Sequence, residues 1–220
     1  MNTLNGFVDE FMERSPFFLV WKTELVDLAV SEKFLGSFDS LVKSFPALIA
    51  AGAARMEDEE TRATLAVNLY QECGEGDVGR THYAIFRKFL ATAGVPISTA
   101  SEMAFTVEWR NSLIKYINGV SSPQAVLGAL AAGEFLAQPV LNKIFAVIEP
   151  LYPGADTEYF TKHLVLEAEH VKEITTTIAR LVDRSHQFEE VVAGYKFGLS
   201  VWESFFSHLT EYIAEKQVVR

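Results

Sequence analysis

Hydrophobic residues repeat with the period of an α-helix along nearly every segment of this chain, and almost no segment alternates as a β-strand does. Proline and glycine separate the helical stretches. We expect helices over roughly residues 5–14, 17–28, 31–45, 57–72, 81–93, 98–117, 123–148, 157–183 and 188–216. The third should stop near Pro46, and the glycines of residues 74–79 should interrupt regular structure. The pattern predicts an all-α bundle of about seven to nine helices. No internal linker divides it, so residues 1–220 should form a single domain.

The charge balance and the cysteine content exclude several classes of protein. The formal net charge is −10 and no Lys/Arg cluster offsets it, so we expect no nucleic-acid partner. Cys73 is the single cysteine, which excludes an intrachain disulfide and any cysteine-based zinc or iron–sulfur site. We interpret Cys73 as a packing residue rather than a nucleophile.

Two observations favour a cytoplasmic protein with no membrane segment. The first residues lack the basic region and apolar core of a signal peptide. The apolar stretch of residues 125–148 approaches membrane-spanning length, but we interpret it as a buried helix. It carries residues that a single-span anchor would not: Glu134, Gln138, Pro139, Asn142 and Lys143.

Three potential metal ligands lie on one predicted helix. His163, Glu167 and His170 are four and three residues apart, which puts them on a single helical face. Much of this segment is apolar, and two imidazoles and a carboxylate on a core-facing stripe are costly to bury unless something binds them. A metal ion is the most economical partner. The alternative is a solvated face with a favourable i,i+4 pair.

A second candidate pair brackets the glycine-rich interruption. A helix broken by glycines can bring Glu72 and His82 to one point, whereas a continuous helix could not do so at ten residues' spacing. Glu75 is a competing carboxylate, because it lies seven residues before His82, which is close to two helical turns. We favour Glu72 because it belongs to the helical half.

Glu134 is isolated among small and apolar residues. A charged carboxylate in that setting needs a partner or must take up a proton. The neighbouring glycines and alanines allow another helix or a ligand to approach closely. The alternative interpretation is a buried ion pair with an arginine. We interpret the two remaining histidines, His186 and His208, as ordinary hydrogen-bonded core or surface residues.

Three carboxylates and three imidazoles suit two iron or manganese ions, as in carboxylate-rich di-metal helical bundles. Three or four of the six would also suffice for one ferrous ion with open coordination positions. Either site can bind and reduce dioxygen, while the protein supplies orientation and a dry cavity.

The run NLYQECGEGDVGRTHYAIFRKFL, the lone Glu134 and the run HLVLEAEH together resemble the heme-oxygenase-like diiron oxidases and oxygenases, also called iron-containing redox enzymes. Their fold relatives include pyrroloquinoline-quinone synthase and thiaminase II. The resemblance covers about residues 15–215 and implies a heme-oxygenase-like helical bundle. The implied metal ligands are Glu72, His82, Glu134, His163, Glu167 and His170.

Two positions depart from the family pattern. The family more often has Asp where this chain has Glu167, and its longer arm could shift the weaker metal site. The family often has two adjacent acids where this chain has Gln71 and Glu72. No histidine precedes His82, so the early axial ligand that heme oxygenases use is missing.

The resemblance implies an O2-activating non-heme diiron oxidase or oxygenase with two Fe2+ ions per chain, or a Mn/Fe pair, and O2 as co-substrate. Its substrate would be a small amine, amino acid or fatty acid, in a biosynthetic pathway. A homodimer and an external electron donor are both compatible with such an enzyme. The alternatives are a metal-free helical binding protein, a thiaminase- or quinone-synthase-like protein on the same fold, and a heme-binding protein.

Overall fold

The computed structural model describes residues 2–22, 25–96, 104–182 and 185–218. Over these ranges the structure contains helices and no strand, which confirms the all-α prediction. Nine α-helices lie in the described residues: α1 (Asn2–Arg14), α2 (Pro16–Val20), α3 (Leu28–Arg55), α4 (Glu59–Glu72), α5 (His82–Thr92), α6 (Ala104–Gly119), α7 (Pro123–Ile148), α8 (Glu158–Leu181) and α9 (Ser185–Val218). Three short 3-10 helices accompany them: η1 (Gly74–Gly76), η2 (Val78–Arg80) and η3 (Glu149–Leu151).

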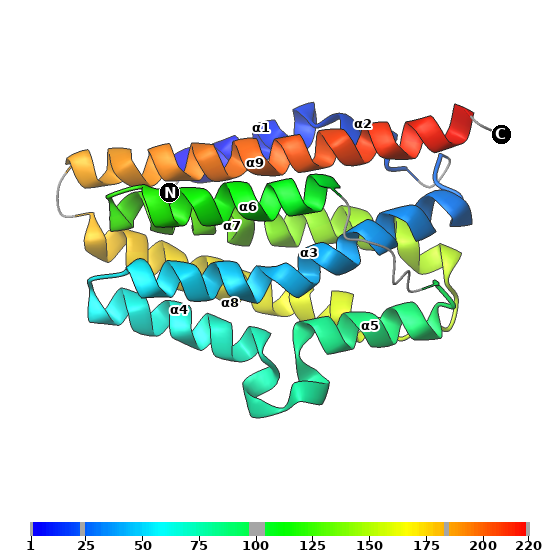
Figure 1. Ribbon diagram of the computed structural model, residues 1–220, viewed down its shortest axis with the longest axis horizontal. Coiled ribbons are helices and arrows are strands. Elements are labelled where there is room, and N and C mark those ends of the chain that lie inside the picture. Colours follow the sequence, from blue (N-terminus) through cyan, green and yellow to red (C-terminus); the bar gives the residue numbers. More distant parts are fainter. Residues whose placement is uncertain (1, 23–24, 97–103, 183–184, 219–220) are drawn as a thin grey trace.

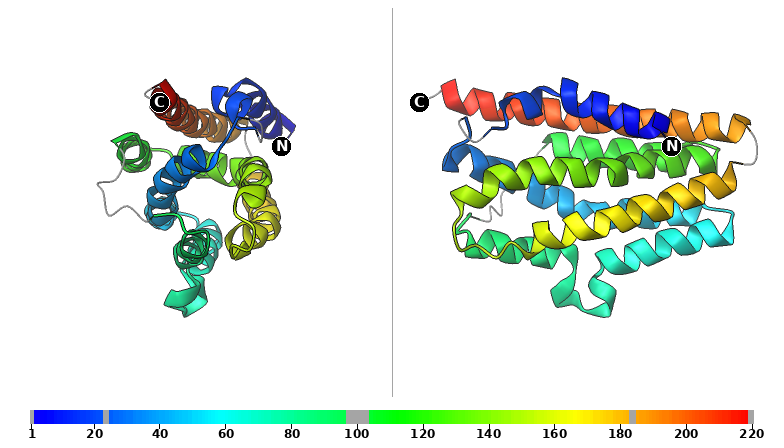
Figure 2. Two further views of the ribbon diagram at one scale, coloured as in Figure 1. Left: turned by 90° about the vertical axis from the view of Figure 1, so that its right-hand side faces the viewer. Right: turned by 180° about the vertical axis from the view of Figure 1, so that it is seen from behind.

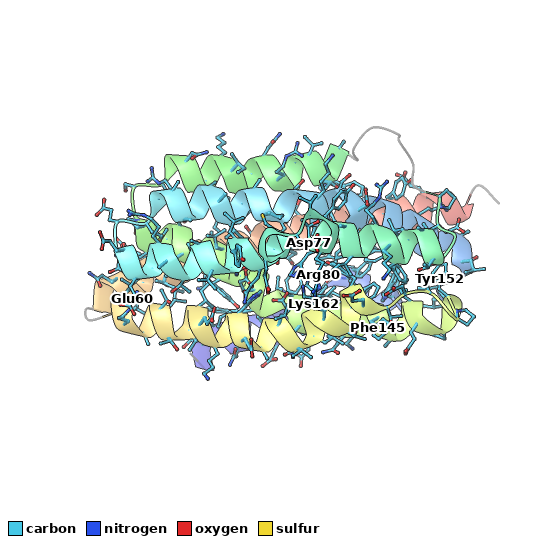
Figure 3. All side chains as sticks on the ribbon, turned by 90° about the horizontal axis from the view of Figure 1, so that it is seen from below. Glu60, Asp77, Arg80, Phe145, Tyr152 and Lys162 are labelled. Atoms are coloured by element: carbon cyan, nitrogen blue, oxygen red, sulfur yellow. The ribbon has the colours of Figure 1, made fainter. Side chains whose placement is uncertain are left out.

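The helices form an elongated bundle. Figure 1 shows α9 along one edge with α1 and α2 beside it, and α4 and α5 along the opposite edge. The helices α3, α6, α7 and α8 lie between these edges. The view along the bundle in Figure 2 shows α3, α7 and α8 around a common interior, with α6 on the outer side of α3. The helices α4 and α5 follow one another nearly in line, with α8 running beside both (Figure 3). The interior is a continuous hydrophobic cluster rich in phenylalanine.

Capping residues explain where several helices begin. The Asp27 carboxylate accepts a hydrogen bond from Val30 N (2.8 Å) at the start of α3. The Ser122 hydroxyl accepts from Ala125 N (3.1 Å) at the start of α7, where proline follows the cap. Each cap satisfies an amide that would otherwise lack a partner in the first helical turn. The sequence therefore fixes these helix starts locally.

The backbones of α7 and α9 touch at glycines, in a contact that we call the glycine seam. A Cβ atom at Gly128 would lie 2.0 Å from the carbonyl oxygen of Val191. A Cβ atom at Gly194 would lie 1.9 Å from the carbonyl oxygen of Ala125. Since real Cβ atoms do not approach a backbone so closely, only glycine allows this packing. The seam makes α7 and α9 the most extensively packed helix pair in the described structure.

The predicted end of the third helix near Pro46 is wrong. The helix α3 continues through this proline to Arg55. Leu48 and Ile49, just beyond it, are each 1% exposed. An interior proline costs about 3 kcal/mol through a lost hydrogen bond and a clash. Burial of these large apolar side chains offsets that cost, at about 1.5–3 kcal/mol each.

The predicted helix over residues 17–28 is also wrong, because α2 ends at Val20 and Asp27 begins a new helix instead. The helix start expected at residues 98–102 lies outside the described residues. The other predicted helices agree with the observed ones to within a few residues at their ends.

Two helical stretches, Leu28–Arg55 and Pro123–Leu151, are long and apolar enough to cross a membrane by length and composition alone. Half of the most apolar window of the first, and 78% of that of the second, is buried inside the protein. Core helices of water-soluble proteins meet the same criteria, so this is weak evidence for a span.

Candidate metal centre

Glu72 and His82 meet because the chain turns back on itself between α4 and α5. Glu72 is the last residue of α4, and His82 is the first of α5, where Thr81 caps the helix. Gly74, Glu75 and Gly76 between them have φ values of 75°, 56° and 92°. This left-handed backbone favours glycine and reverses the chain. As a result, His82 Nδ1 lies 2.9 Å from Glu72 Oε1.

The loop also decides between the two carboxylates that the sequence left open. Glu75 is exposed and lies on the protruding loop, whereas Glu72 is 5% exposed and faces the interior. Cys73 is exposed as well, so its interpretation as a packing residue is wrong. Cys73 follows the last residue of α4, where the chain leaves the bundle, so its thiol faces solvent instead of packing in the core.

His163, Glu167 and His170 lie on one buried face of α8, each at most 5% exposed. The alternative of a solvated face is therefore wrong. His163 Nδ1 lies 2.6 Å from the carbonyl oxygen of Tyr159, and it can only donate there. This hydrogen bond assigns the proton to Nδ1 and leaves Nε2 free to bind a metal.

His170 has the opposite arrangement. Its Nε2 lies 2.9 Å from Gln71 Oε1, an acceptor on α4, so Nδ1 is the nitrogen left to bind. This Nδ1 lies 3.3 Å from Glu134 Oε2 and 3.6 Å from Glu167 Oε2. The two histidines of α8 thus present different ring nitrogens.

Glu134 reaches the same place from α7. It is 4% exposed, and its Oε1 accepts a hydrogen bond from Asn68 Nδ2 at 2.9 Å. In the described structure its partners are this amide and His170, so the alternative of a buried ion pair with an arginine is wrong.

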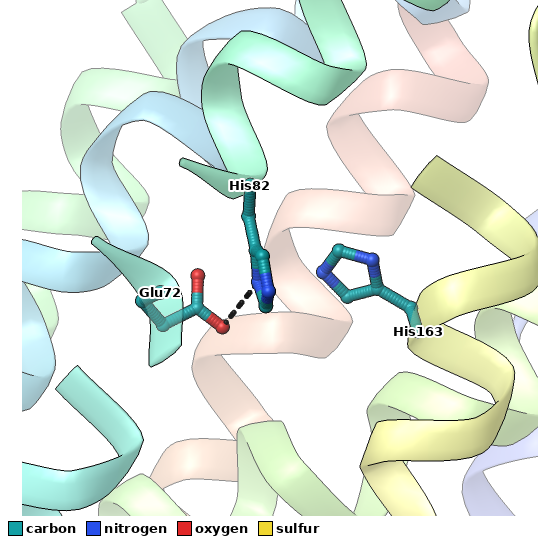
Figure 4. A group of neighbouring side chains, drawn as sticks. All are labelled: Glu72, His82 and His163. Carbon is teal, nitrogen blue, oxygen red and sulfur yellow. Dashed lines mark ion pairs between the residues drawn. The ribbon is translucent and has the colours of Figure 1, made fainter. Parts of the chain in front are cut away.

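The six side chains form two neighbouring groups. One ligand atom from each of Glu72, His82 and His163 lies within 4.8 Å of the others, and the same holds for Glu134, Glu167 and His170. Figure 4 shows the first group, with the imidazoles facing each other across a small gap and Glu72 beside His82. The ring centroids of His82 and His163 are 4.2 Å apart. The structure therefore brings together all six residues singled out in the sequence.

The polar atoms of these groups converge without satisfying one another. Both ring nitrogens of His82, His170 Nδ1 and Glu167 Oε2 are buried and lack a hydrogen-bond partner in the described structure. Short distances such as that from His82 to Glu72 therefore do not have hydrogen-bond geometry. Buried unpaired polar atoms are costly, and a metal ion in each group would satisfy one nitrogen of each histidine and the carboxylate oxygens that face it. The residues fit a metal centre.

The electrostatics of the metal-free groups point the same way. Burial, together with the nearby His82, lowers the pKa of His163 to about 4, so its imidazole is neutral and ready to donate a lone pair. Burial and the charge of Glu134 raise the pKa of Glu167, while burial opposes the charge on His170. The two carboxylates outweigh that opposition and raise the pKa of His170. Without a metal, the second group holds protons in place of a cation.

The other histidine with a described side chain lies away from the site. His208 is exposed on α9, and its Nδ1 donates to the carbonyl oxygen of Ser204 at 2.8 Å. This agrees with its interpretation as an ordinary surface residue. The side chain of His186 lies outside the described residues.

Sequence reasoning missed the residues that support the ligands. Asn68 orients Glu134, and Gln71 orients His170. Asn68 lies one helical turn before Glu72 and Gln71 is its immediate neighbour, so a buried polar residue near a ligand was an available signal. Which ligand each one supports depends on the packing of α4 against α7 and α8.

A model of a protein family described as iron-containing redox enzyme matches residues 32–203. A search of curated proteins finds no significant match. Among solved structures, a CADD-like protein of unknown function from Nostoc punctiforme is similar, with a TM-score of 0.81 and 18% identity over 96% of this chain and 97% of that one.

Two further solved structures show the same fold. A domain of unknown function with a heme oxygenase-like fold from Shewanella denitrificans has a TM-score of 0.77 and 16% identity, over 98% of this chain and 92% of that one. A TenA homologue from Pyrococcus furiosus has a TM-score of 0.72 and 17% identity, over 94% of this chain and 98% of that one. At these identities the likeness supports the heme-oxygenase-like fold alone.

Proposed function

Since this chain belongs to the iron-containing redox enzyme family, we propose that it is an O2-activating non-heme diiron oxidoreductase that oxidises a small organic substrate. The observation that carries the proposal is the pair of buried triads, whose lone pairs converge without hydrogen-bonding one another. Imidazole and carboxylate ligands suit iron and manganese.

Each triad would hold one ion. Glu72, His82 and the Nε2 of His163 would bind the first. Glu134, Glu167 and the Nδ1 of His170 would bind the second. Three carboxylates against two divalent cations leave a net charge of +1, so the metal ions would compensate the carboxylates in place of the protons that the second group holds without metal.

Ferrous iron, when bound, supplies an O2-binding position and electrons for O2 reduction, and the substrate or an external donor supplies the remaining electrons. The protein's own contribution is positional. The Tyr159 carbonyl and Gln71 hold the two histidines of α8 in fixed tautomers, and Asn68 fixes one oxygen of Glu134. Burial of all six ligands excludes bulk water from the reacting atoms.

The test is anaerobic titration of metal-free protein with ferrous iron, followed by exposure to O2. We expect about two irons per chain in Mössbauer spectra, and oxidation of both ions on O2 exposure. The same titration with one equivalent each of Mn2+ and Fe2+ distinguishes an Fe/Fe from a Mn/Fe centre.

Matched variants make this test specific to the two triads. His163→Ala should remove about one ion and His170→Ala the other, whereas His208→Ala, exposed on α9, should leave both. If the unchanged protein binds no stoichiometric iron and shows no O2-dependent change, the oxidoreductase proposal fails. The metal-free binding protein of the same fold then takes its place.

A further inference from the structure

A cavity adjoins the ligand groups on the side of α3 and α7. Its free space is about 580 Å3, part of which is open to solvent. Glu72, His163 and Glu167 form one end of its lining. A molecule in this cavity would contact both ligand groups, because Glu72 and His163 belong to the first and Glu167 to the second.

The rest of the lining is almost entirely hydrocarbon. From α3 it includes Phe38 and Leu41, and from α7 it includes Leu136 and Val140. Apart from the candidate ligands, the polar side-chain groups among these lining residues are the Tyr159 hydroxyl and the Trp202 indole N–H. These two side chains are 4% and 8% exposed. Apolar walls of this kind favour apolar ligand surface, at about 25 cal/mol per Å2 buried.

No charged side chain is left over to neutralise a charged ligand. Within the part of the chain that the structure describes, neither Lys nor Arg lines the cavity. Its ionisable groups besides Tyr159 are the three candidate ligands, whose charge would be compensated by metal. Taking an ammonium group into such a place without a partner is costly. A carboxylate would have a partner only in the metal-loaded protein, where two divalent cations against three carboxylates leave a net charge of +1.

We propose that this cavity binds the substrate, and that the part of the substrate inside it is apolar and carries no ammonium group. The inference rests on the proposed function. A hydrocarbon chain or ring fits along the walls, and a neutral oxygen could bond to Tyr159 or Trp202. A free amino acid, which carries two charges within two bonds of each other, does not fit. The amino-acid substrates that the family resemblance left open are thereby excluded.

Gly133 helps to set the size of the cavity. It precedes Glu134 on α7, and a Cβ atom there would lie 3.2 Å from Phe45 Cε2 and 3.6 Å from Trp202 Nε1. Phe45 and Trp202 also line the cavity. A side chain at position 133 would therefore occupy space that the ligand needs, as would a larger residue in place of Ala137, which is half-buried in the same wall.

The experiment uses six-carbon ligands that differ in their head group: neutral hexan-1-ol, cationic hexylammonium, anionic hexanoate and zwitterionic norleucine. Binding is measured by calorimetry on the iron-loaded protein without O2 and on the metal-free protein. We expect hexan-1-ol to bind both forms at least about 10-fold more tightly than hexylammonium and norleucine, and to bind the metal-free protein at least about 10-fold more tightly than hexanoate, since burying an unpaired charge is costly. Ala137→Phe and Gly133→Leu should each weaken hexan-1-ol binding at least about 10-fold by filling the cavity.

Asn142→Ala, an exposed site on the same helix, is the control and should leave hexan-1-ol binding unchanged. The inference would be overturned if hexylammonium or norleucine bound either form as tightly as hexan-1-ol, or if hexanoate bound the metal-free protein as tightly. So would hexan-1-ol binding that survives both cavity-filling variants while their iron stoichiometry stays at that of the unchanged protein.

The two proposals fail separately. Two irons per chain with no binding of hexan-1-ol would refute the substrate class and leave the metal centre standing. Hexan-1-ol binding that follows the cavity variants in a protein that takes up no iron would refute the oxidoreductase and leave an apolar binding site.

Discussion

The helix α7 has two interfaces of opposite character. Toward α9, Gly128 allows the backbones to touch. Toward α4 and α8, Glu134 contacts an amide and a histidine whose other partners are incomplete. The first interface stabilises the fold. The second contains buried polar atoms without hydrogen-bond partners, which lower the stability of the protein until a ligand binds them. The helix α7 thus packs tightly on α9 with one side and contributes Glu134 to the candidate metal centre with the other.

The largest expected effect comes from breaking the glycine seam. Gly128→Ala would place a methyl group 2.0 Å from the Val191 carbonyl oxygen, and a backbone atom cannot move aside as a side chain can. We expect the free energy of unfolding to fall by about 3 kcal/mol. Urea unfolding followed by circular dichroism measures it.

The control is Gly36→Ala, at an exposed position in α3 with no heavy atom within 4 Å of the added methyl group. Here we expect stabilisation of about 0.5–1 kcal/mol, because alanine loses less backbone entropy in a helix. Equal effects of the two substitutions would show that the seam is not tightly packed.

A substitution at the interface of α7 with α4 and α8 should raise stability rather than lower it. Glu134→Gln retains an oxygen for Asn68 but removes a buried negative charge near Glu167. We expect the free energy of unfolding of the metal-free protein to rise by about 1 kcal/mol, because Glu134 and Glu167 no longer repel each other and Glu167 can still pair with His170. The rise in melting temperature on adding Mn2+ or Fe2+ should shrink, since one ligand is weakened.

Thermal unfolding with and without metal measures both changes. Glu149→Gln, exposed at the end of α7, is the control and should alter neither. If the Glu134→Gln protein without metal were less stable than the unchanged protein without metal, the negative charge of Glu134 would not be unfavourable at this interface.

A smaller effect should come from the support of one ligand. Gln71→Leu removes the acceptor that fixes the His170 ring, and we expect metal affinity to fall about 10-fold. Competition titration with a chelator and Co2+ measures it. Gln138→Leu is the matched control. Gln138 Nε2 donates to the carbonyl oxygen of Leu164 on α8, the helix that carries His170, and in the described structure it bonds to no candidate ligand side chain. Equal losses in the two variants would mean that Gln71 acts on packing alone.

The smallest effect concerns a surface contact that joins α4 to α8 at their outer ends. Hydrogen bonds from Arg180 and Thr61 hold the pKa of Asp58 below its ordinary value. A lowered folded-state pKa means that the stabilisation is present above pH about 4, the unfolded value, and is lost as the pH falls further. Asp58 is 39% exposed, so the contribution is small.

Urea midpoints of the unchanged protein and Arg180→Gln at pH 7, 5 and 3 test this. The variant should be slightly less stable at pH 7 and 5, and the difference should narrow at pH 3. Arg14→Gln, which removes an exposed positive charge on α1, is the control and should not reproduce that pH dependence. A difference that widens toward pH 3 would contradict the assignment.

Local spacing explains what the sequence could predict. His163, Glu167 and His170 share a face because the helix geometry is fixed, and the structure shows that face buried. Glu72 and Glu75 could not be separated by spacing, because the answer depends on three left-handed residues in the intervening loop. Once the chain turns there, Glu75 faces solvent.

The errors arise where packing overrides local preference. Pro46 is a helix-breaking signal, yet the burial of Leu48 and Ile49 keeps α3 helical beyond it. The supporting contacts from Asn68 and Gln71 reach across to α7 and α8, and no single-helix pattern reveals which helices will be neighbours. The sequence therefore predicts the helices and the grouping of the six candidate ligands better than it predicts their supports.

The loop between α4 and α5 leaves the bundle and returns to its own starting point. A Cβ atom at Gly74 would lie 2.5 Å from Thr81 N, so the two ends of the loop are in contact. The residues between these ends are exposed, with Val78 82% exposed, and Figure 1 shows them projecting from the molecule. An affinity tag or a spectroscopic label inserted after Val78 would therefore lie outside the bundle, and the distance between Glu72 and His82 would stay unchanged. This makes the loop the natural attachment point for immobilising the protein on an electrode or a surface.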